Sequence, residues 1–286
     1  MHVIKNSFSS IKVDSQGAQL LSWEDLLQSK PVLWNLNETY WNRVSPILFP
    51  FVGRLINDSY TYNEKTYRMP QHGFARDADF TCIYEQENQI TLRLCSDALS
   101  RECYPFDFEF TVNYELQERT LCVSNTVKNT GSIPMLFGFG AHPGFHIEGD
   151  ISEYRLQIIG KTKLQRHMIQ NGYYTGETEW VNFEGDGFLS LNEEYFKDDA
   201  IVFKHENIDS MRLWKGDTPL IDFDITGIPA PYWGIWKKPQ APFLCLEPWW
   251  GIADSIGFKG DLRDKEGMNS LLPGESRSYE YKIAKW

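Results

Sequence analysis

Two residues of this sequence, Glu247 and His142, have the chemistry and the surroundings for proton transfer. Glu247 follows the apolar run Phe-Leu-Cys-Leu and precedes Pro-Trp-Trp, which predicts a carboxylate at the end of a buried strand. A buried carboxylate is costly unless it is paired or hydrogen-bonded, so it is either half of a structural ion pair or a functional group. His142 lies in the loop Gly-Ala-His-Pro-Gly-Phe, and a lone histidine is more often structural than catalytic.

Positive charges gather in two other stretches. The segment RMPQHGFARD holds His72 between two arginines, and Arg54 follows a glycine after an apolar run. Arginines are more often surface charges or ion-pair partners than ligand-binding groups. The segment is therefore either a charged surface turn or a loop that points donors such as His72 and Arg76 into a pocket. Three further histidines lie in polar contexts, and we expect no role for them: His2, His167 and His205.

A histidine and a glutamate that face each other across an aromatic pocket form a general acid/base pair. The carboxylate of Glu247 can accept a proton, and the imidazolium of His142 can donate one. We expect their mutual attraction to keep the imidazolium charged nearer to neutral pH than an unperturbed histidine, whose pKa is about 6.5. Opening a cyclic hemiacetal sugar needs this chemistry, because one oxygen gains a proton while another loses one.

Motifs and charge argue against several other functions. His142 and His146 are four residues apart, but the Pro-Gly pair between them disfavours a helix that would turn both toward one metal ion, so we expect no metal. Neither a GxGxxG nor a Walker motif occurs, which disfavours nucleotide cofactors, and no GxSxG elbow supports esterase chemistry. The net charge of -11, with no basic stripe, disfavours nucleic acid and acidic membranes as partners.

Strands must position these groups, because apolar residues alternate along much of the chain. In residues 106–116, FDFEFTVNYEL, every second residue is apolar, which predicts a strand with one buried and one exposed face. The same alternation occurs in 90–94 and 278–286, and residues 61–67 indicate two short strands around a turn at Asn63-Glu64. Short helices are expected only near ALSRECY and SLNEEYF. We predict an all-β fold of antiparallel sheets packed face to face.

Length and composition favour one domain over residues 1–286. Aromatic residues make up 15% of the chain, more than a core requires, so we expect some rings to line a cavity. The five cysteines form no CxxC pair, which indicates reduced and mostly buried thiols. No apolar signal segment and no apolar run of about 20 residues occurs, so we expect a cytoplasmic protein, as a monomer or homodimer.

Four ordered motifs resemble those of a known family, the aldose 1-epimerases or sugar mutarotases, in particular their bacterial LacX-like branch. FPFVGRLIND resembles the family's arginine segment, and QHGFAR its first histidine motif. GAHPGF resembles the second histidine motif, and CLEPWWGIAD the glutamate motif. The resemblance covers nearly the whole chain, and it implies a large antiparallel β-sandwich of the galactose mutarotase type.

The resemblance also implies a role for each matching residue. His142 becomes the general acid toward the ring oxygen, and Glu247 the general base on the anomeric hydroxyl. The sugar is held by residues expected to bind substrate: Arg54, His72, Arg76, Asp199 and Trp249. Asp199, in FKDDAIVFK, is the candidate for an aspartate that binds sugar hydroxyls. No cofactor is needed, because both steps are proton transfers.

The nature of the sugar is left open by the sequence. QHGFAR is also characteristic of the related hexose-6-phosphate mutarotases, where its arginine grips the phosphate, and Arg54 or Arg43 would then supply a second cation. Because the net charge of -11 offers a phosphate dianion no general attraction, the free sugar is favoured. Two alternatives to a mutarotase are a sugar-binding or sensing protein without activity and an enzyme for another sugar derivative. A protein that only binds sugar needs neither His142 nor Glu247 in titratable form.

Overall fold

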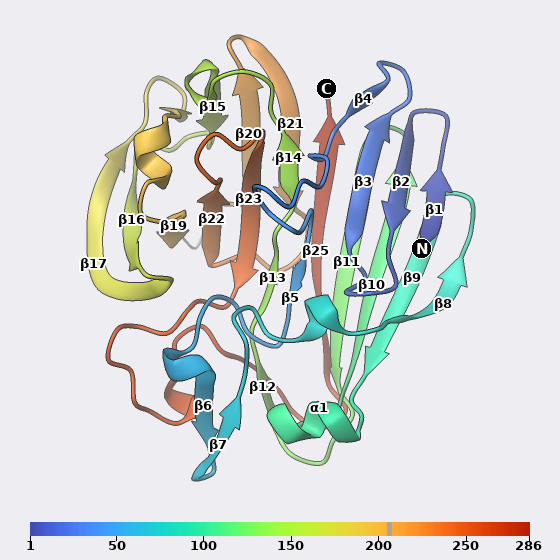
Figure 1. Ribbon diagram of the computed structural model, residues 1–286, viewed down its shortest axis with the longest axis vertical. Coiled ribbons are helices and arrows are strands. Elements are labelled where there is room, and N and C mark those ends of the chain that lie inside the picture. Colours follow the sequence, from blue (N-terminus) through green and yellow to red (C-terminus); the bar gives the residue numbers. More distant parts are fainter. Residues whose placement is uncertain (205–207) are drawn as a thin grey trace.

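The computed structural model describes residues 1–204 and 208–286, so His205 lies outside the described residues. Most of the chain forms antiparallel β-sheets, and two of these sheets are large (Figure 1). From edge to edge, the nine-stranded sheet consists of β18 (Phe188–Ser190), β15 (Tyr154–Gln157), β20 (Ser210–Lys215), β21 (Thr218–Ile225), β25 (Ser276–Lys285), β11 (Thr120–Asn129), β10 (Phe108–Gln117), β9 (Gln89–Cys95) and β8 (Thr81–Glu85).

The second large sheet has eight strands and carries most of the candidate site. Its order is β17 (Tyr173–Asn182), β16 (Lys163–Gln170), β19 (Ile201–Lys204), β22 (Tyr232–Trp236), β23 (Phe243–Trp250), β13 (Phe139–Ala141) and β5 (Ile47–Leu48). The short strand β14 (Gly144–His146) pairs with β23 beside this path. β23 is buried along its whole length, so a polar side chain on it must find a partner.

Smaller elements complete the chain. A four-stranded sheet consists of β1 (His2–Lys5), β2 (Ser9–Val13), β3 (Leu20–Asp25) and β4 (Lys30–Pro31). Two further sheets have two strands each: the hairpin of β6 (Ser59–Tyr62) with β7 (Lys65–Arg68), and the long-range antiparallel pair of β12 (Met135–Phe137) with β24 (Asn269–Leu271). The helices are α1 (Ala98–Cys103) and the 3₁₀ turns η1 (Ile56–Asp58), η2 (Ala75–Asp77), η3 (Ile151–Glu153), η4 (Glu193–Phe196) and η5 (Leu262–Asp264).

The two large sheets pack face to face through aromatic side chains. The ring of Phe223 on β21 meets that of Trp233 on β22 with centroids 5.4 Å apart. The ring of Phe139 on β13 stacks on that of Tyr279 on β25 at 4.9 Å. These residues belong to one continuous cluster of buried apolar side chains. The predicted all-β sandwich is therefore confirmed.

The alternating pattern correctly predicts individual strands. On β10, buried and partly exposed residues alternate through nine positions, with the apolar set inside. The strands expected in 90–94 and 278–286 are β9 and β25, and the hairpin expected in 61–67 is the β6–β7 pair. ALSRECY forms α1 with an Asp97 capping box, whereas SLNEEYF forms only the 3₁₀ turn η4.

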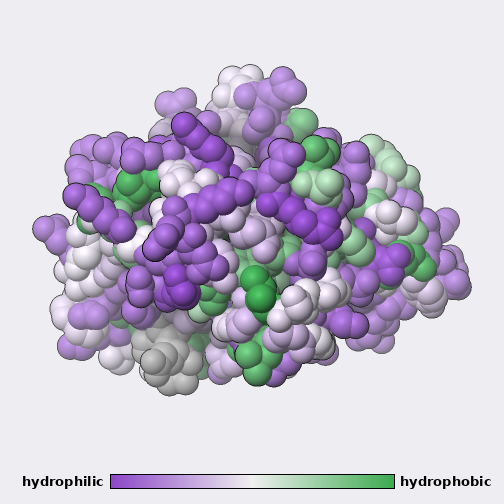
Figure 2. Space-filling view, turned by 90° about the horizontal axis from the view of Figure 1, so that it is seen from below, coloured by the Kyte–Doolittle hydropathy of each residue, from purple (hydrophilic) through white to green (hydrophobic). Residues whose placement is uncertain are grey.

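Seen from below in Figure 2, hydrophilic residues cover most of the face and hydrophobic residues form small separate groups.

The burial of the cysteines differs from the expectation. All five cysteines are free, as predicted, but only Cys245 is buried, and Cys95 is exposed. The expectation of mostly buried thiols was wrong because Cys95 and Cys122 lie on the partly exposed faces of strands. Among the described residues, no helix is long and apolar enough to cross a membrane.

Candidate active site

A cavity of about 260 Å³ collects side chains from distant parts of the chain. Trp233 on β22 points toward the nine-stranded sheet, so its neighbour Gly234 faces the opposite side. Glu247 is the register partner of Gly234 and shares that outer face, on which the cavity lies. Its wall contains every predicted site residue except Arg54: His72, Arg76, His142, Asp199, Glu247 and Trp249.

Glu247 is held on β23 in an almost fully buried position. Its side chain is 1% exposed, and the indole N–H of Trp249 donates to its Oε2 at 3.2 Å. The indole lies over glycines of both neighbouring strands: a Cβ on Gly234 or Gly140 would come within 2.5 or 2.8 Å of its ring. Glu247 Oε1 is buried and has no hydrogen-bond partner among the described residues. Glu247 therefore keeps one acceptor free for a ligand.

His142 lies in the short turn between β13 and β14, directly against Glu247. Its Nε2 is 3.2 Å from Glu247 Oε2. The indole rings of Trp41 and Trp236 flank the imidazole, with centroids 4.9 and 5.5 Å away. β14 pairs with β23, so the turn that carries His142 is fixed to the strand that carries Glu247. The predicted acid and base are thus neighbours in space.

The protonation of this pair differs from the expectation. Burial lowers the pKa of His142 to about 3, and the nearby Arg76 guanidinium also disfavours the imidazolium. Burial raises the pKa of Glu247 well above its usual range, and the Asp199 carboxyl adds to this effect. Desolvation of both groups therefore favours a neutral imidazole and a protonated carboxyl, the opposite direction to the expected imidazolium.

His72 is locked in one orientation and one tautomer. It has a φ of +68°, which is uncommon outside glycine, and its N–H donates to the Gly53 carbonyl at 2.9 Å. The Gly53 N–H in turn donates to His72 Nδ1 at 3.1 Å. Nδ1 must therefore be unprotonated, and burial keeps the pKa of His72 well below 6.5. The neutral ring therefore carries its proton on Nε2, which lies 3.3 Å from the Gln71 side-chain nitrogen.

The arginines lie at one side of the cavity. Arg76 lines the wall, and its guanidinium donates to the Gln71 carbonyl at 2.7 Å. Among the described residues its buried Nε has no hydrogen-bond partner, and Asp77 Oδ2 lies 3.8 Å away. Arg43 binds the Arg76 carbonyl at 3.1 Å and Asp77 at 2.5 Å, so it supports the loop from outside. Burial and the charge of Arg43 lower the pKa of Arg76.

Arg54 and Asp199 occupy neighbouring positions. Arg54 lies beside the cavity rather than in its wall: its guanidinium donates to the Asn171 carbonyl at 3.3 Å and lies 5.9 Å from the Tyr173 ring. Asp199 lines the cavity and accepts the Ala200 N–H at 2.8 Å. Burial raises the pKa of Asp199, and the positive charge of Arg54 opposes that rise.

Several residues of the wall were not found from the sequence. Trp41, Trp236, Gln71 and Lys238 all line the cavity. The high aromatic content predicted that rings would do so, but no motif marks Trp41 or Trp236 among 10 tryptophans. Gln71 stands inside the quoted motif QHGFAR. Lys238, in WKKPQ, has no sequence signal that separates it from a surface lysine.

Loops around the cavity are tied together by a buried ion pair. Lys265 Nζ lies 3.1 Å from Asp254 Oδ1, and both side chains are 3% exposed. Asp254 Oδ2 accepts the Ile56 N–H at 2.9 Å, and the Asp254 N–H donates to the Arg54 carbonyl at 2.9 Å. Asp254 therefore fixes the segment that carries Gly53 and Arg54 to the loop that follows β23.

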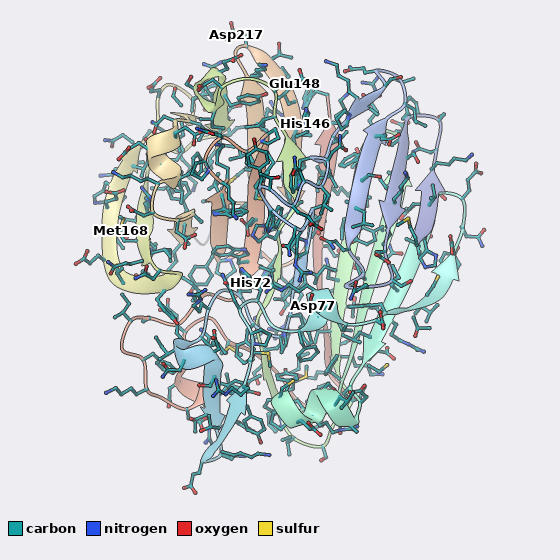
Figure 3. The ribbon with its side chains drawn as sticks, viewed as in Figure 1. His72, Asp77, His146, Glu148, Met168 and Asp217 are labelled. Atoms are coloured by element: carbon teal, nitrogen blue, oxygen red, sulfur yellow. The ribbon has the colours of Figure 1, made fainter. Side chains whose placement is uncertain are left out.

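Possible metal ligands in the site are His142, Cys245 and Glu247, whose donor atoms lie within 4.8 Å of one another. His146, which the sequence spacing suggested as a second metal ligand beside His142, does not belong to this group. His146 lies on β14 with its Nε2 3.8 Å from Glu148 Oε1, and Figure 3 shows both residues far above His72. Because His146 lies on a strand, the four-residue spacing does not place the two histidines on one face of a helix.

Comparison with known proteins gives consistent results. A family model described as aldose 1-epimerase matches residues 1–260. The plasmid and chromosomal LacX proteins of Lactococcus lactis subsp. lactis are each 27% identical to this chain, over 98% of it and 97% of their own length.

Solved structures are also similar over the whole chain. A galactose mutarotase related enzyme from Lactobacillus acidophilus is 33% identical, with a TM-score of 0.93 and coverage of 100% of this chain and 97% of the other. A galactose mutarotase-like protein from Lactobacillus casei ATCC 334 is 29% identical, with a TM-score of 0.93 and coverage of 99% of each chain. A galactose 1-epimerase from Lactobacillus acidophilus NCFM, 14% identical with a TM-score of 0.71 and coverage of 99% of this chain and 92% of its own, shares the fold.

Proposed function

The chain belongs to the aldose 1-epimerase family, and from this premise we propose that it is a mutarotase that interconverts the α and β anomers of an aldohexose. The observation that carries the proposal is the pair of His142 and Glu247, 3.2 Å apart in the wall of the cavity. At about 260 Å³ the cavity is just below the usual range of drug-sized ligand pockets, about 300–1,000 Å³, which suits a monosaccharide.

Ring opening uses the one proton that the pair holds. When the sugar binds, the proton moves from Glu247 Oε2 to His142 Nε2, 3.2 Å away. Glu247 then accepts the proton of the anomeric hydroxyl while His142 donates its proton to the ring oxygen, and the ring C–O bond breaks. The aldehyde turns about the C1–C2 bond, and the reverse transfers close the ring on the other face. The proton count of the pair is the same before and after the reaction.

Other residues bind and orient the sugar. A sugar hydroxyl provides the partner that Glu247 Oε1 lacks, which favours the carboxylate form. The fixed Nε2–H of His72 and the carboxyl of Asp199 provide a donor and an acceptor for hydroxyls. The indoles of Trp41, Trp236 and Trp249 offer apolar faces to the sugar ring.

The proposal is tested by NMR exchange between anomers on a panel of sugars. The panel contains glucose, galactose and their 6-phosphates. A mutarotase accelerates exchange of at least one pair of anomers in proportion to enzyme concentration. A protein that only binds sugar shifts or broadens the resonances on binding but leaves the rate of anomer exchange at the buffer value.

The pH dependence follows from the shared proton. His142, with its pKa of about 3, takes a second proton only in strong acid, and the raised pKa of Glu247 keeps the first proton on the pair at higher pH. We therefore expect kcat/KM to show no inflection near the ordinary histidine pKa of about 6.5. A pH series of initial rates measures this. A steady decline above about pH 6.5, approaching tenfold per pH unit, would show that His142 titrates as an ordinary imidazolium.

A second candidate substrate is a hexose 6-phosphate. The observation that favours it is the presence of two cations, Arg76 and Lys238, in the cavity wall. An arginine fork matches the geometry of phosphate oxygens, and a lysine supplies a second charge. Arg76 Nε is buried, makes no hydrogen bond to the described residues, and lies 3.8 Å from the Asp77 carboxylate, so it can still donate to an anion.

Arg76→Ala distinguishes the two substrates. On a hexose 6-phosphate, loss of a charge-assisted contact worth about 1.5–3 kcal/mol lowers kcat/KM roughly 10- to 100-fold, with little effect on the free sugar. If the substrate is a free aldose, both sugars are affected alike, because Arg76 then only supports the Gln71–His72 loop through the Gln71 carbonyl. Parallel measurements of kcat/KM on one sugar, with and without its 6-phosphate, distinguish the two substrates. Arg93→Ala, which removes a partly exposed arginine paired with Glu109 on the nine-stranded sheet, is the matched control.

A further inference from the structure

We propose that His142, Cys245 and Glu247 form a binding site for a thiophilic divalent cation such as Zn²⁺, and that this cation inhibits the protein by occupying the acid/base pair. All three side chains are buried, and one ligand atom from each lies within 4.8 Å of the other two. The binding site itself rests only on this geometry, whereas the inhibition also rests on the proposed function.

The backbone brings the three donors together. Cys245 and Glu247 are two residues apart on β23, so both side chains point to the same side of the sheet. Gly144 of β14 is the register partner of Cys245, which places the turn with His142 next to this part of β23. His142 Nε2 and Glu247 Oε2 are already 3.2 Å apart.

The donor set suits zinc better than a hard cation. Zinc binds imidazole nitrogen, thiolate and carboxylate at about 2.0–2.3 Å, which puts the donors of a tetrahedral site roughly 3.3–3.8 Å apart. His142 Nε2 and Glu247 Oε2 already have this spacing, and the sulfur, within 4.8 Å of a donor atom of each, closes a gap of at most about 1–1.5 Å. Magnesium prefers oxygen donors and strict octahedral geometry, so a site with one thiol and one imidazole excludes it.

Binding changes the charge of the site in a balanced way. The incoming Zn²⁺ displaces one proton from the Cys245 thiol and one from the Glu247 carboxyl, and two protons leave to solvent. Two anionic ligands then offset the two positive charges, and neutral His142 supplies its nitrogen lone pair. His142 and Glu247 line the cavity, which gives the ion an entry path and leaves a fourth position for water. The zinc-bound pair can neither accept nor donate a proton.

A second cluster on the protein provides an internal control. His2, Cys82 and Glu85 also offer three donors within 4.8 Å of one another, but they are partly or fully exposed. His2 Nδ1 and Glu85 Oε2 are hydrogen-bonded at 2.8 Å, on strands β1 and β8 outside the cavity. Metal bound there should not affect activity. The experiments are therefore made in a Cys82→Ala background, which removes this cluster.

The first experiment measures inhibition. In Cys82→Ala, Zn²⁺ is expected to inhibit anomer exchange, and Mg²⁺ at the same concentration is not. Adding Cys245→Ala should leave the basal rate close to that of the background and raise the Zn²⁺ inhibition constant at least about tenfold, since even the loss of an outer partner of a metal ligand costs about 10–100-fold in affinity. Cys245→Ser, which keeps the size of the buried side chain, is used if the alanine variant melts below the assay temperature.

The second experiment does not depend on activity. Co²⁺ added to Cys82→Ala in place of Zn²⁺ should give a thiolate-to-cobalt charge-transfer band in the near ultraviolet, and the band should disappear in the Cys245 variants. Absence of the band in Cys82→Ala, or equal zinc inhibition with and without Cys245, overturns the proposal. If the band forms but no sugar of the panel is turned over, the metal site stands and the proposed function fails.

Discussion

Glu247→Gln is expected to lower kcat by about 10²–10⁴-fold, the usual contribution of a positioned acid or base. The amide is nearly isosteric with the carboxyl and can still accept the Trp249 N–H that now binds Oε2. It cannot take the proton of the anomeric hydroxyl, so chemistry is lost while sugar binding is largely retained. Initial rates at several sugar concentrations separate kcat from KM.

The same variant should not be less stable at neutral pH. Burial raises the pKa of Glu247, so the folded protein keeps this proton while the unfolded chain releases it above about pH 4.5. The contribution of Glu247 to the free energy of unfolding therefore falls as pH rises from its pKa in the unfolded chain toward its pKa in the folded protein. Glutamine does not titrate, so the variant does not lose this stability. An unchanged or higher Tm with lost activity supports a functional role. A large drop in Tm with full activity per folded molecule would instead identify Glu247 as a structural ion-pair partner. Glu109→Gln, on β10, is the control.

His142→Ala is expected to lower kcat by a similar factor, about 10²–10⁴-fold, while the protein stays folded. The imidazole is the group that holds the ring-oxygen proton in the proposed reaction, and it lies 3.2 Å from Glu247. Because burial keeps the pKa of His142 at about 3, the substitution removes no charge from the folded protein near neutral pH. Circular dichroism and Tm establish that the variant is folded before its kcat is measured.

His146→Ala is the matched control for this prediction. His146 lies four residues further along the chain, pairs with Glu148 and is remote from His72 (Figure 3). We expect the activity of His146→Ala to stay within about threefold of the wild type, because surface substitutions usually change free energies by about 0.5 kcal/mol or less. Wild-type turnover in folded His142→Ala would remove His142 from the mechanism. Equal losses in both variants would indicate a general effect on β14 instead.

The fold could be predicted because strand periodicity is a local signal. The apolar residues of FDFEFTVNYEL from Phe108 onward form the buried face of β10. The four motifs around Arg54, His72, His142 and Glu247 could also be located, since glycine, proline and aromatic residues mark each of them. Their convergence at one cavity could not be derived from periodicity. It depends on the pairing of β23 with β14 and β22, which are long-range contacts.

Residues of the site without a local signal were missed. Trp41 and Trp236 are distant from His142 in sequence and contact it only after the chain has folded. Lys238 differs from other lysines only in lining the cavity. The protonation of the acid/base pair was predicted in the wrong direction because its cause is burial. The sequence indicates that Glu247 ends an apolar run, but not that both members of the pair are desolvated together.

The central claim is that the His142–Glu247 pair catalyses the interconversion of sugar anomers. The most direct test compares wild type and Glu247→Gln at equal concentrations of folded protein. Polarimetry follows freshly dissolved α-glucose and α-galactose, and NMR exchange follows their 6-phosphates. We predict that the wild type brings at least one of these sugars to its anomeric equilibrium much faster than buffer alone, and that Glu247→Gln loses about 10²–10⁴-fold of that rate. Folded wild-type protein that leaves every sugar of the panel at the buffer rate would contradict the claim.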